Sequence, residues 1–242
     1  MRYRYTSLSE IGLKRLDNED YYGVFKFEEG LLVIVCDGLG GNKAGEVASK
    51  LTVNTIKEVF SELNNVDYLE RIKQAIYSAN NTVLEKSSKK PELSGMATTV
   101  EVLFLNNDTA YWGHIGDSRI YGLKNNKLKQ MTKDHSLVQK LVDEGYLTLR
   151  EAENHTNKNI IMRALGDNPS IEIDLSKQRL NQKDDYKFFI CTDGVTGVIP
   201  DSELQDFLRL KDINAISNSL SQVIIERGAP DNYTFVIITK TE

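Results

Sequence analysis

The sequence predicts an α+β protein in which two packed antiparallel β-sheets are covered by outer helices. Strand-like segments occur in groups separated by short turns, which is typical of antiparallel neighbours. Longer segments with helical periodicity lie between these groups and do not alternate with single strands, so the pattern does not indicate repeated βαβ units. Two packed sheets with helices on the outside satisfy both observations.

Eight segments have the length and the apolar or alternating pattern of strands. They are residues 3–8, 21–27, 31–36, 98–105, 109–115, 119–123, 186–191 and 233–239. The apolar runs LLVIVC and FFIC lie in two of these segments and contain Cys36 and Cys191. With only two cysteines in the chain, we expect buried, reduced thiols and no disulfide framework.

Three segments have helical character. A helix is predicted over residues 44–63, directly after the first Asp-Gly turn. Two more follow from apolar residues spaced three or four apart. These residues are Leu69, Ile72, Ile76, Ala79 and Val83 in one segment, and Ile213, Ile216, Leu220, Val223 and Ile224 in the other.

The chain reads as one domain, 1–242, because it has no internal repeat, no low-complexity stretch and only four prolines. Within it, residues 136–166 combine a short amphipathic helix, polar turns and a second apolar turn around 160–165. This composition is compatible with a lid. A purely structural helical insert is equally consistent.

Charge and hydropathy exclude several classes of function. The formal net charge is −5, and no basic stretch is denser than the run at 86–90, so we expect no nucleic-acid partner. The N-terminal residues MRYRYTSLSE lack the apolar core of a signal peptide, and the apolar run 31–36 is too short to span a bilayer. We expect a cytoplasmic protein without membrane contact, and a monomer.

Aspartates flank five of the predicted strands. They are Asp20, Asp37, Asp117, Asp193 and Asp231. A single Asp-Gly pair is above all a hairpin signal. Several carboxylates brought together, however, repel one another unless cations neutralise them. All-oxygen ligands favour Mg²⁺ or Mn²⁺, and the shortage of His and Cys argues against zinc, so we predict a multi-metal hydrolase site.

The glycine-rich stretch DGLGGNKAGE at 37–46 raises nucleotide binding as an alternative, because backbone amides after a strand can hold phosphate. Its detailed templates fail. Lys43 stands where a dinucleotide fingerprint needs glycine, and Glu46-Val47 stands where a P-loop needs Lys-Ser or Lys-Thr. The glycines are better explained by a turn or by close backbone approach.

Seven ordered blocks resemble those of the type 2C metal-dependent Ser/Thr protein phosphatases, the PPM family, and especially its compact bacterial members. They are IGLKRLDNED at 11–20, VCDGLGGNKAGEVAS at 35–49, SGMATTV at 94–100, GHIGDSRIY at 113–121, TKDHS at 132–136, ICTDGVTGVI at 190–199 and APDNYTFVII at 229–238. The resemblance covers almost the whole chain. It implies a four-layer αββα sandwich with a binuclear metal site at one edge and a flap, residues 136–166, beside it.

The resemblance also implies the metal ligands. Asp37 would bridge two ions, Gly38 would offer its carbonyl to one of them, and Asp193 and Asp231 would hold the other. The implied cofactors are two Mn²⁺ or Mg²⁺ ions per chain. Such ions lower the pKa of a bound water and stabilise the oxygens of an in-line displacement.

Further residues follow from the same blocks. Glu19 and Asp20 would organise metal-bound water, Asp117 matches the position of a third, weaker metal site, and Asn232 would support the site beside Asp231. Taken alone, Arg15 is a surface cation on a turn, but it matches the arginine that grips the substrate phosphate. The expected catalytic residues are Arg15, Asp37 and Asp193.

Three residues depart from the family pattern without removing a proposed metal ligand. Ala97 replaces a usual glycine and Glu10 a common aspartate. Asn42 stands where bacterial members often carry histidine, so a histidine general acid is not expected at that loop and leaving-group protonation would rely on metal-bound water. His135 could cap the next helical segment or reach the site as a proton donor, and it is not counted among the catalytic residues.

The implied function is hydrolysis of phosphoserine and phosphothreonine in proteins, as part of signal transduction, with the substrates of a Ser/Thr kinase as partners. Two alternatives stay open. One is a phosphatase dedicated to a phosphorylated regulatory partner of the anti-sigma antagonist kind. The other is a non-catalytic phosphoprotein-binding module, against which the intact Asp37, Asp193 and Asp231 argue.

Overall fold

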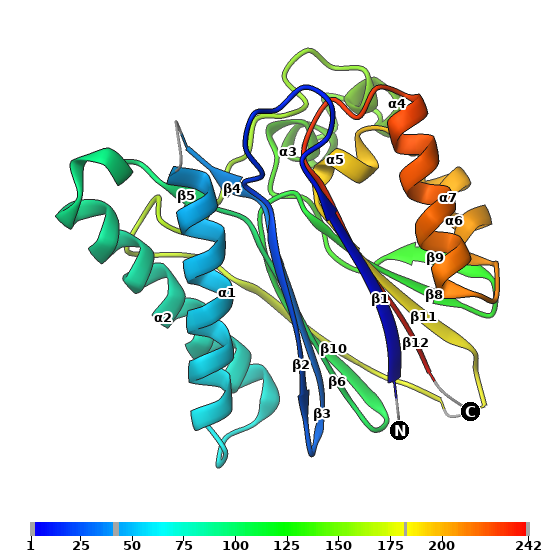
Figure 1. Ribbon diagram of the computed structural model, residues 1–242, viewed down its shortest axis with the longest axis horizontal. Helices are drawn as coiled ribbons and strands as arrows, with labels where there is room; N and C mark the ends of the chain where they lie inside the picture. The colour runs from blue at the N-terminus through cyan, green and yellow to red at the C-terminus, as the bar shows by residue number, and fades with distance from the viewer. Residues whose placement is uncertain (1–2, 41–43, 182, 241–242) are drawn as a thin grey trace.

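The structure is a computed structural model that describes residues 3–40, 44–181 and 183–240. Two five-stranded antiparallel sheets pack face to face, and helices cover the outer face of each, as Figure 1 shows. The predicted fold class, an αββα sandwich, is confirmed. None of the helices in the described part of the chain combines the length and apolar character that crossing a bilayer requires.

The first sheet has the strand order β1-β12-β11-β8-β9. Its strands are β1 (Tyr3–Glu10), β8 (Arg119–Lys124), β9 (Lys127–Gln130), β11 (Tyr186–Cys191) and β12 (Tyr233–Lys240). The outer helices on this sheet are α6 (Asp201–Leu208) and α7 (Ile213–Glu226), and the single turn α5 (Asp193–Thr196) follows β11 directly.

The second sheet has the strand order β10-β7-β6-β3-β2. Its strands are β2 (Tyr21–Phe27), β3 (Gly30–Cys36), β6 (Val100–Asn106), β7 (Thr109–Ile115) and β10 (Asp174–Arg179). Helices α1 (Ala44–Glu62) and α2 (Tyr68–Lys89) cover its outer face. Strands β4 (Gly38–Leu39) and β5 (Ala97–Thr98) form a separate two-stranded ribbon near the start of α1. Strand β4 directly precedes α1, and β5 follows the short 3-10 turn Pro91–Leu93.

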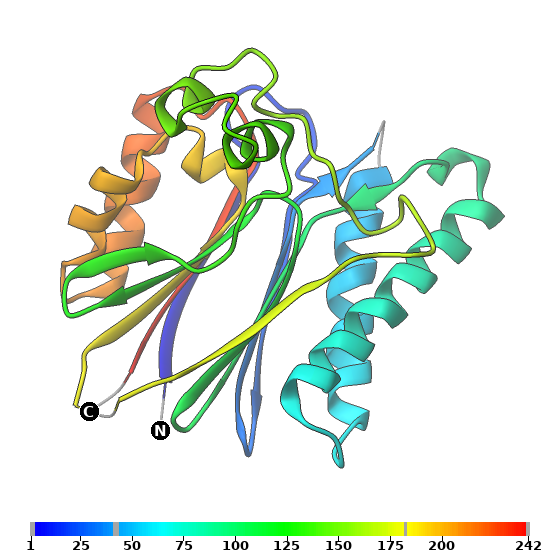
Figure 2. The same ribbon diagram turned by 180° about the vertical axis from the view of Figure 1, so that it is seen from behind.

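The segment between β9 and β10 carries two short helices, α3 (Leu137–Asp143) and α4 (Leu149–Glu153). Ser136 caps α3, and a capping box between Thr148 and Glu151 begins α4. Figure 2 shows this segment at the end of the sandwich where the long β1–β2 loop also lies. We keep the name flap for residues 136–166.

Strand β3 shows why its sequence is apolar throughout. Alternate residues of a strand point to opposite faces, and both faces of β3 are covered. Leu31, Val33 and Val35 pack in the core between the two sheets. Leu32 and Ile34 pack in a second core against α1 and α2.

Three elements lack the patterns that predicted the others. Strands β9 (KLKQ) and β10 (DLSKQR) are polar, because they lie at sheet edges and are largely exposed. Helix α6 is only eight residues long. The predicted strand 98–105 is also divided, since β5 ends at Thr98 and β6 begins at Val100.

Arg71 connects the two helices that cover the second sheet. It is 2% exposed, and its Nε and Nη2 donate hydrogen bonds to the carbonyl of Phe60 in the last turn of α1, at 3.1 and 2.6 Å. Its Nη1 donates to Glu29 at 2.9 Å, and the guanidinium lies 4.0 Å above the Phe60 ring. The carbonyl that the end of α1 leaves free is therefore bound by a buried cation.

We expect Arg71→Met to lower the free energy of unfolding by about 3 kcal/mol, because a buried carbonyl and Glu29 lose a charged donor. Urea denaturation measures this. Lys73→Met, on a half-buried position of the same helix, is the matched control and should change stability by less than about 0.5 kcal/mol. Equal effects of the two substitutions would contradict the assigned role of Arg71.

Candidate metal centre and active site

The strand registers bring the predicted carboxylates to one end of the sandwich. Tyr21 pairs with Cys36, so Asp20 and Asp37 lie side by side just beyond the paired ends of β2 and β3. In the other sheet, Cys191 pairs with Phe235 and with Arg119, so the end of β11 lies beside the starts of β8 and β12. Antiparallel neighbours thus collect residues that are far apart in the sequence.

Two of the connections that pass from one sheet to the other at this end carry predicted site residues. The β1–β2 loop carries Arg15, Glu19 and Asp20, and the β7–β8 turn carries Asp117. Asp193 follows β11 and Asp231 precedes β12. The predicted site residues therefore lie at the same end of the sandwich and come from both sheets.

Burial and mutual repulsion raise the pKa values of Asp20, Asp37, Asp117 and Asp193. Desolvation is the largest cause for Asp37, whose pKa is raised well above its ordinary value, followed by the charges of Asp20 and Asp193. The pKa of Asp20 is raised to about 7 and that of Asp117 to about 8, again chiefly by desolvation. Desolvation and the charge of Asp231 raise the pKa of Asp193. The cluster is one that bound cations would stabilise.

Three carboxylate oxygens in this region are buried and have no hydrogen-bond partner: Glu19 Oε1, Asp20 Oδ1 and Asp117 Oδ1. Unpaired, buried oxygens with negative charge are suited to hard cations such as Mg²⁺ or Mn²⁺. The donor set therefore fits the implied ions. Among the described residues, no group of three or more His, Cys, Asp or Glu side chains is already arranged as a ligand shell.

The Asp-Gly pairs owe their glycines to close backbone approach and not to hairpin turns. A Cβ on Gly38 would lie 2.2 Å from the carbonyl oxygen of Gly45 and 2.6 Å from that of Glu19. A Cβ on Gly194 would lie 1.9 Å from the carbonyl oxygen of Asn232. Only glycine lets these segments approach so closely.

Asn232 holds the β1–β2 loop against the start of β12. Its Oδ1 accepts a hydrogen bond from the Glu19 amide at 2.9 Å. Its Nδ2 donates to the carbonyls of Ile11 and Asp17 at 2.9 and 3.0 Å. The side chain thus positions Glu19 and the loop that carries Arg15.

Arg15 lies at the rim of the carboxylate cluster. Its Nη2 forms an ion pair with Asp231 Oδ2 at 2.7 Å. The second oxygen of Asp231 accepts a hydrogen bond from the Asn232 amide at 2.8 Å. Both oxygens of this carboxylate are therefore engaged within the chain.

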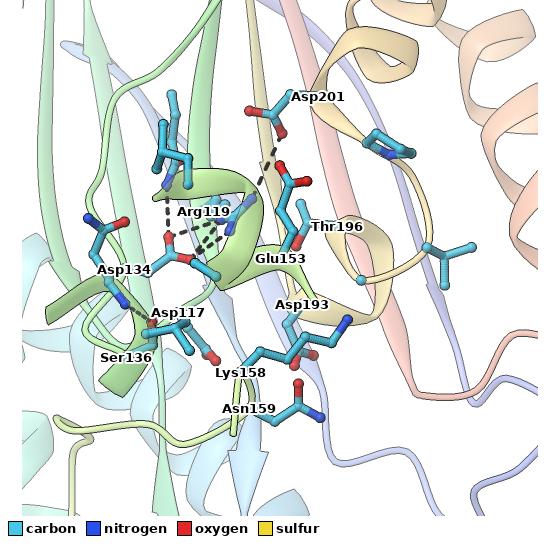
Figure 3. A pocket seen from close by; sticks show the side chains of 18 residues that line it. Asp117, Arg119, Asp134, Ser136, Glu153, Lys158, Asn159, Asp193, Thr196 and Asp201 are labelled. Atoms are coloured by element: carbon cyan, nitrogen blue, oxygen red, sulfur yellow. Dashed lines mark hydrogen bonds and ion pairs between the residues drawn. The ribbon is translucent and has the colours of Figure 1, made fainter. Parts of the chain in front are cut away.

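A groove of about 460 Å³ opens beside Asp117 and Asp193 (Figure 3). The flap forms one wall, and α5 with the start of α6 forms the other. Arg119 on the groove lining binds Asp134 through Nε and Nη2, with the shortest contact 2.7 Å, and donates to the Tyr121 hydroxyl at 2.9 Å. Arg119 and Asp134 were not predicted as site residues, although both lie in the blocks that resemble the family.

The structure favours neither of the two roles considered for His135. Ser136, not His135, supplies the side-chain cap of α3. The His135 Nδ1 accepts a hydrogen bond from the Gly116 amide at 3.1 Å, and its side chain is only 7% exposed. Asn42, the position of the missing histidine, lies outside the described residues.

Comparison with known proteins assigns the fold and the blocks to one family. The family model for protein phosphatase 2C matches residues 14–227. The chain belongs to the protein phosphatase 2C family. The resemblance inferred from the sequence blocks is thereby confirmed.

Individual relatives agree with this assignment. The chain is 32% identical to the serine/threonine protein phosphatase PstP of Mycobacterium tuberculosis, over 97% of this chain but only 44% of PstP, so it spans less than half of that relative. It is 32% identical to the serine/threonine phosphatase stp of Listeria welshimeri, over 95% of this chain and 92% of stp. A crystal structure of the PstP catalytic domain in complex with two manganese ions superposes with a TM-score of 0.87, at 31% identity and 99% coverage of both chains.

The raised pKa of Asp117 leads to a prediction for the metal-free protein. A carboxyl whose pKa rises on folding, here to about 8 from ~3.9, lowers stability as the pH increases between these values. We expect Asp117→Asn to raise the free energy of unfolding in chelator at pH 8 by at least about 1 kcal/mol, and the gain to shrink toward pH 4. Urea denaturation across this pH range measures it.

Asp206→Asn, on the exposed side of α6, is the control and should show no such gain. If Asp117→Asn destabilised the protein at pH 8, or if its effect were the same at every pH, the carboxylate repulsion would not have the assigned effect on stability.

Proposed function

We propose that this protein hydrolyses phosphoserine and phosphothreonine in proteins, using a water activated by two bound Mn²⁺ or Mg²⁺ ions. The observation that carries the proposal is the set of buried, unpartnered oxygens on Glu19, Asp20 and Asp117 within a cluster of mutually repelling carboxylates. The family assignment and the manganese complex of the PstP catalytic domain support it.

The proposed ligands are those that the resemblance to the family implies, and their positions at the strand ends are compatible with these roles. Asp37 and the Gly38 carbonyl would hold one ion, and Asp37, Asp193 and Asp231 the other. Glu19 and Asp20 would orient coordinated water, and Asp117 would hold a third, weaker ion. Bound divalent ions would supply an acidified water and charge stabilisation during in-line displacement at phosphorus.

Arg15 would bind the phosphoryl group, since a guanidinium forms charge-assisted hydrogen bonds with phosphoryl oxygens. In the structure its Nη2 is bound to Asp231. A metal ion at Asp231 would draw on the carboxylate charge that also holds Arg15. Ligation by Asp231 would therefore weaken this ion pair and release Arg15 toward the substrate.

The groove beside Asp193 is the proposed path of the phosphorylated polypeptide. Its flap wall includes Leu149, Glu153 and Lys158, and its other wall includes Thr196 and Asp201. Of the two cations that line it, Arg119 is bound to Asp134, whereas Lys158 makes no ion pair with any described residue. These side chains would contact the substrate residues on either side of the phosphorylated residue. The flap would select substrates through these contacts.

The first prediction for activity concerns metal dependence. We expect phosphate release from a phosphothreonine peptide to require Mn²⁺ or Mg²⁺, to stop in chelator, and to fall at least a hundredfold, roughly, in Asp193→Asn, because a carboxylate ligand is lost. Asp206→Asn is the matched control and should retain wild-type activity. Metal stoichiometry, measured on the same samples, should be two tightly bound ions per chain.

Other outcomes separate the alternatives. A folded protein that binds metal but releases phosphate from no peptide would favour a dedicated regulatory partner. A folded protein that binds neither ion and releases no phosphate would favour the phosphoprotein-binding module.

The second prediction concerns the flap. Replacing residues 145–158 with the corresponding segment of a relative should change the ratio of kcat/KM between two phosphopeptides by about tenfold or more, if lost contacts are worth about 1.4 kcal/mol. Hydrolysis of a small aryl phosphate should change much less, because it does not reach the groove. An unchanged peptide preference would leave the flap a purely structural insert.

A further inference from the structure

His135 lies between the β7–β8 turn and the base of the flap. Its backbone amide donates to the Gly116 carbonyl at 2.7 Å, and its Nδ1 accepts from the Gly116 amide at 3.1 Å. Main chain and side chain of one residue therefore bind both polar groups of Gly116. Gly116 directly precedes Asp117.

The two ends of the flap are paired with each other beside the same residue. The Met162 amide donates to the His135 carbonyl at 2.7 Å, and the Leu137 amide donates to the Ile160 carbonyl at 2.9 Å. An isolated bridge between Ser136 and Ile161 lies between these bonds. His135 thus belongs both to the closed base of the flap and to the support of the Asp117 turn.

The bond from the Gly116 amide requires a neutral His135 ring with its proton on Nε2. Burial, and then the charge of His114, lower the pKa of His135 to about 4, so the ring is neutral. With Nδ1 accepting, the proton lies on Nε2, which faces Asp174 Oδ2 at 3.3 Å. Arg163 Nη1 lies 3.2 Å from the same Nε2 and is ion-paired with Asp174. The ring also lies 4.4 Å from that of His114, which is held by Glu101 and by the Lys133 carbonyl.

Neighbouring residues restrict the conformation of the Gly116–Ser118 turn. Gly116 has a φ of +118°, and a Cβ there would lie 2.6 Å from the Cβ of Thr99. On the same side, the hydroxyls of Ser118 and Thr99 lie 2.9 Å apart. Thr99 holds the turn from one side and His135 from the other, while Asp117 Oδ1 between them stays without a partner.

We propose that His135 is a positioning residue, which couples the base of the flap to the Gly116–Ser118 turn and thereby aims the Asp117 carboxylate. The expected effect of His135 on metal binding rests on the proposed function, whereas its effect on the turn does not. A histidine acting only through packing would be replaceable by any residue of similar size. The specific requirement here is an acceptor at the position of Nδ1.

Two amide side chains test that requirement. In His135→Asn the amide oxygen can take the position of Nδ1, whereas in His135→Gln the amide group reaches the position of Nε2 instead. We expect exchange of the Gly116 amide hydrogen in metal-free protein, followed by NMR, to accelerate roughly fivefold or more in His135→Ala and His135→Gln, the effect of one lost hydrogen bond. His135→Asn should stay within about twofold of the wild type.

Mn²⁺ titration provides the second readout. The weakest measurable Mn²⁺ site should lose affinity roughly fivefold in His135→Ala and His135→Gln and be retained in His135→Asn. His155→Ala is the matched control, because His155 Nδ1 also accepts a backbone amide bond at 3.1 Å, from Asn157, but within the flap. It should change neither readout.

The outcomes are distinguishable. Unchanged Gly116 exchange in a folded His135→Ala protein, or equal exchange in the Asn and Gln variants, would overturn the positioning role. Faster exchange with unchanged Mn²⁺ affinity would overturn the coupling to Asp117. Failure of the phosphatase proposal would instead appear as a wild-type protein without phosphate release, and the exchange results would still decide the role of His135.

Discussion

Repulsion among carboxylates at one end of the sandwich is the constraint on which the other features of the site depend. Asp20, Asp37, Asp117, Asp193 and Asp231 reach this end from both sheets, and burial raises the pKa values of the first four. A chain selected only for stability would not keep such a cluster, because desolvated like charges cost free energy. Metal binding would explain why the cluster is kept, because ions bind best where negative charges are already held together.

The carboxylates cannot simply move apart, because the surrounding main chain is held on several sides. The Asp37 amide donates to the Thr99 hydroxyl at 2.9 Å, and the Asp37 carbonyl accepts from the Thr98 hydroxyl at 2.8 Å. The Asp20 carboxylate accepts a hydrogen bond from the Thr192 hydroxyl at 2.8 Å. Asn232 ties the β1–β2 loop to β12. These partners are neutral, so they restrain the acids without neutralising them. The negative charge therefore remains available to cations.

The strand ends that carry the carboxylates could be predicted from the sequence, because each is marked by two local patterns. An apolar run marks a buried strand, and an aspartate directly after it marks the strand end. The edge strands β9 and β10 carry no apolar pattern and were missed. The link between His135 and Gly116 was missed for a different reason, since two residues 19 positions apart show no periodicity that would join them. The close backbone approach at Gly38 and Gly194 could not be predicted either, because it depends on how distant segments pack.

The ion pair between Arg15 and Asp231 links two proposed functions of the site. The ion pair joins a proposed metal ligand to the proposed phosphate-binding residue, and each neutralises the charge of the other. A metal ion at Asp231 would draw on the same negative charge and so weaken the hold on Arg15. Because Arg15 is half exposed, it can turn away at little cost in desolvation. Metal binding would thus prepare the phosphate clamp, so the two steps of the proposed reaction share one carboxylate.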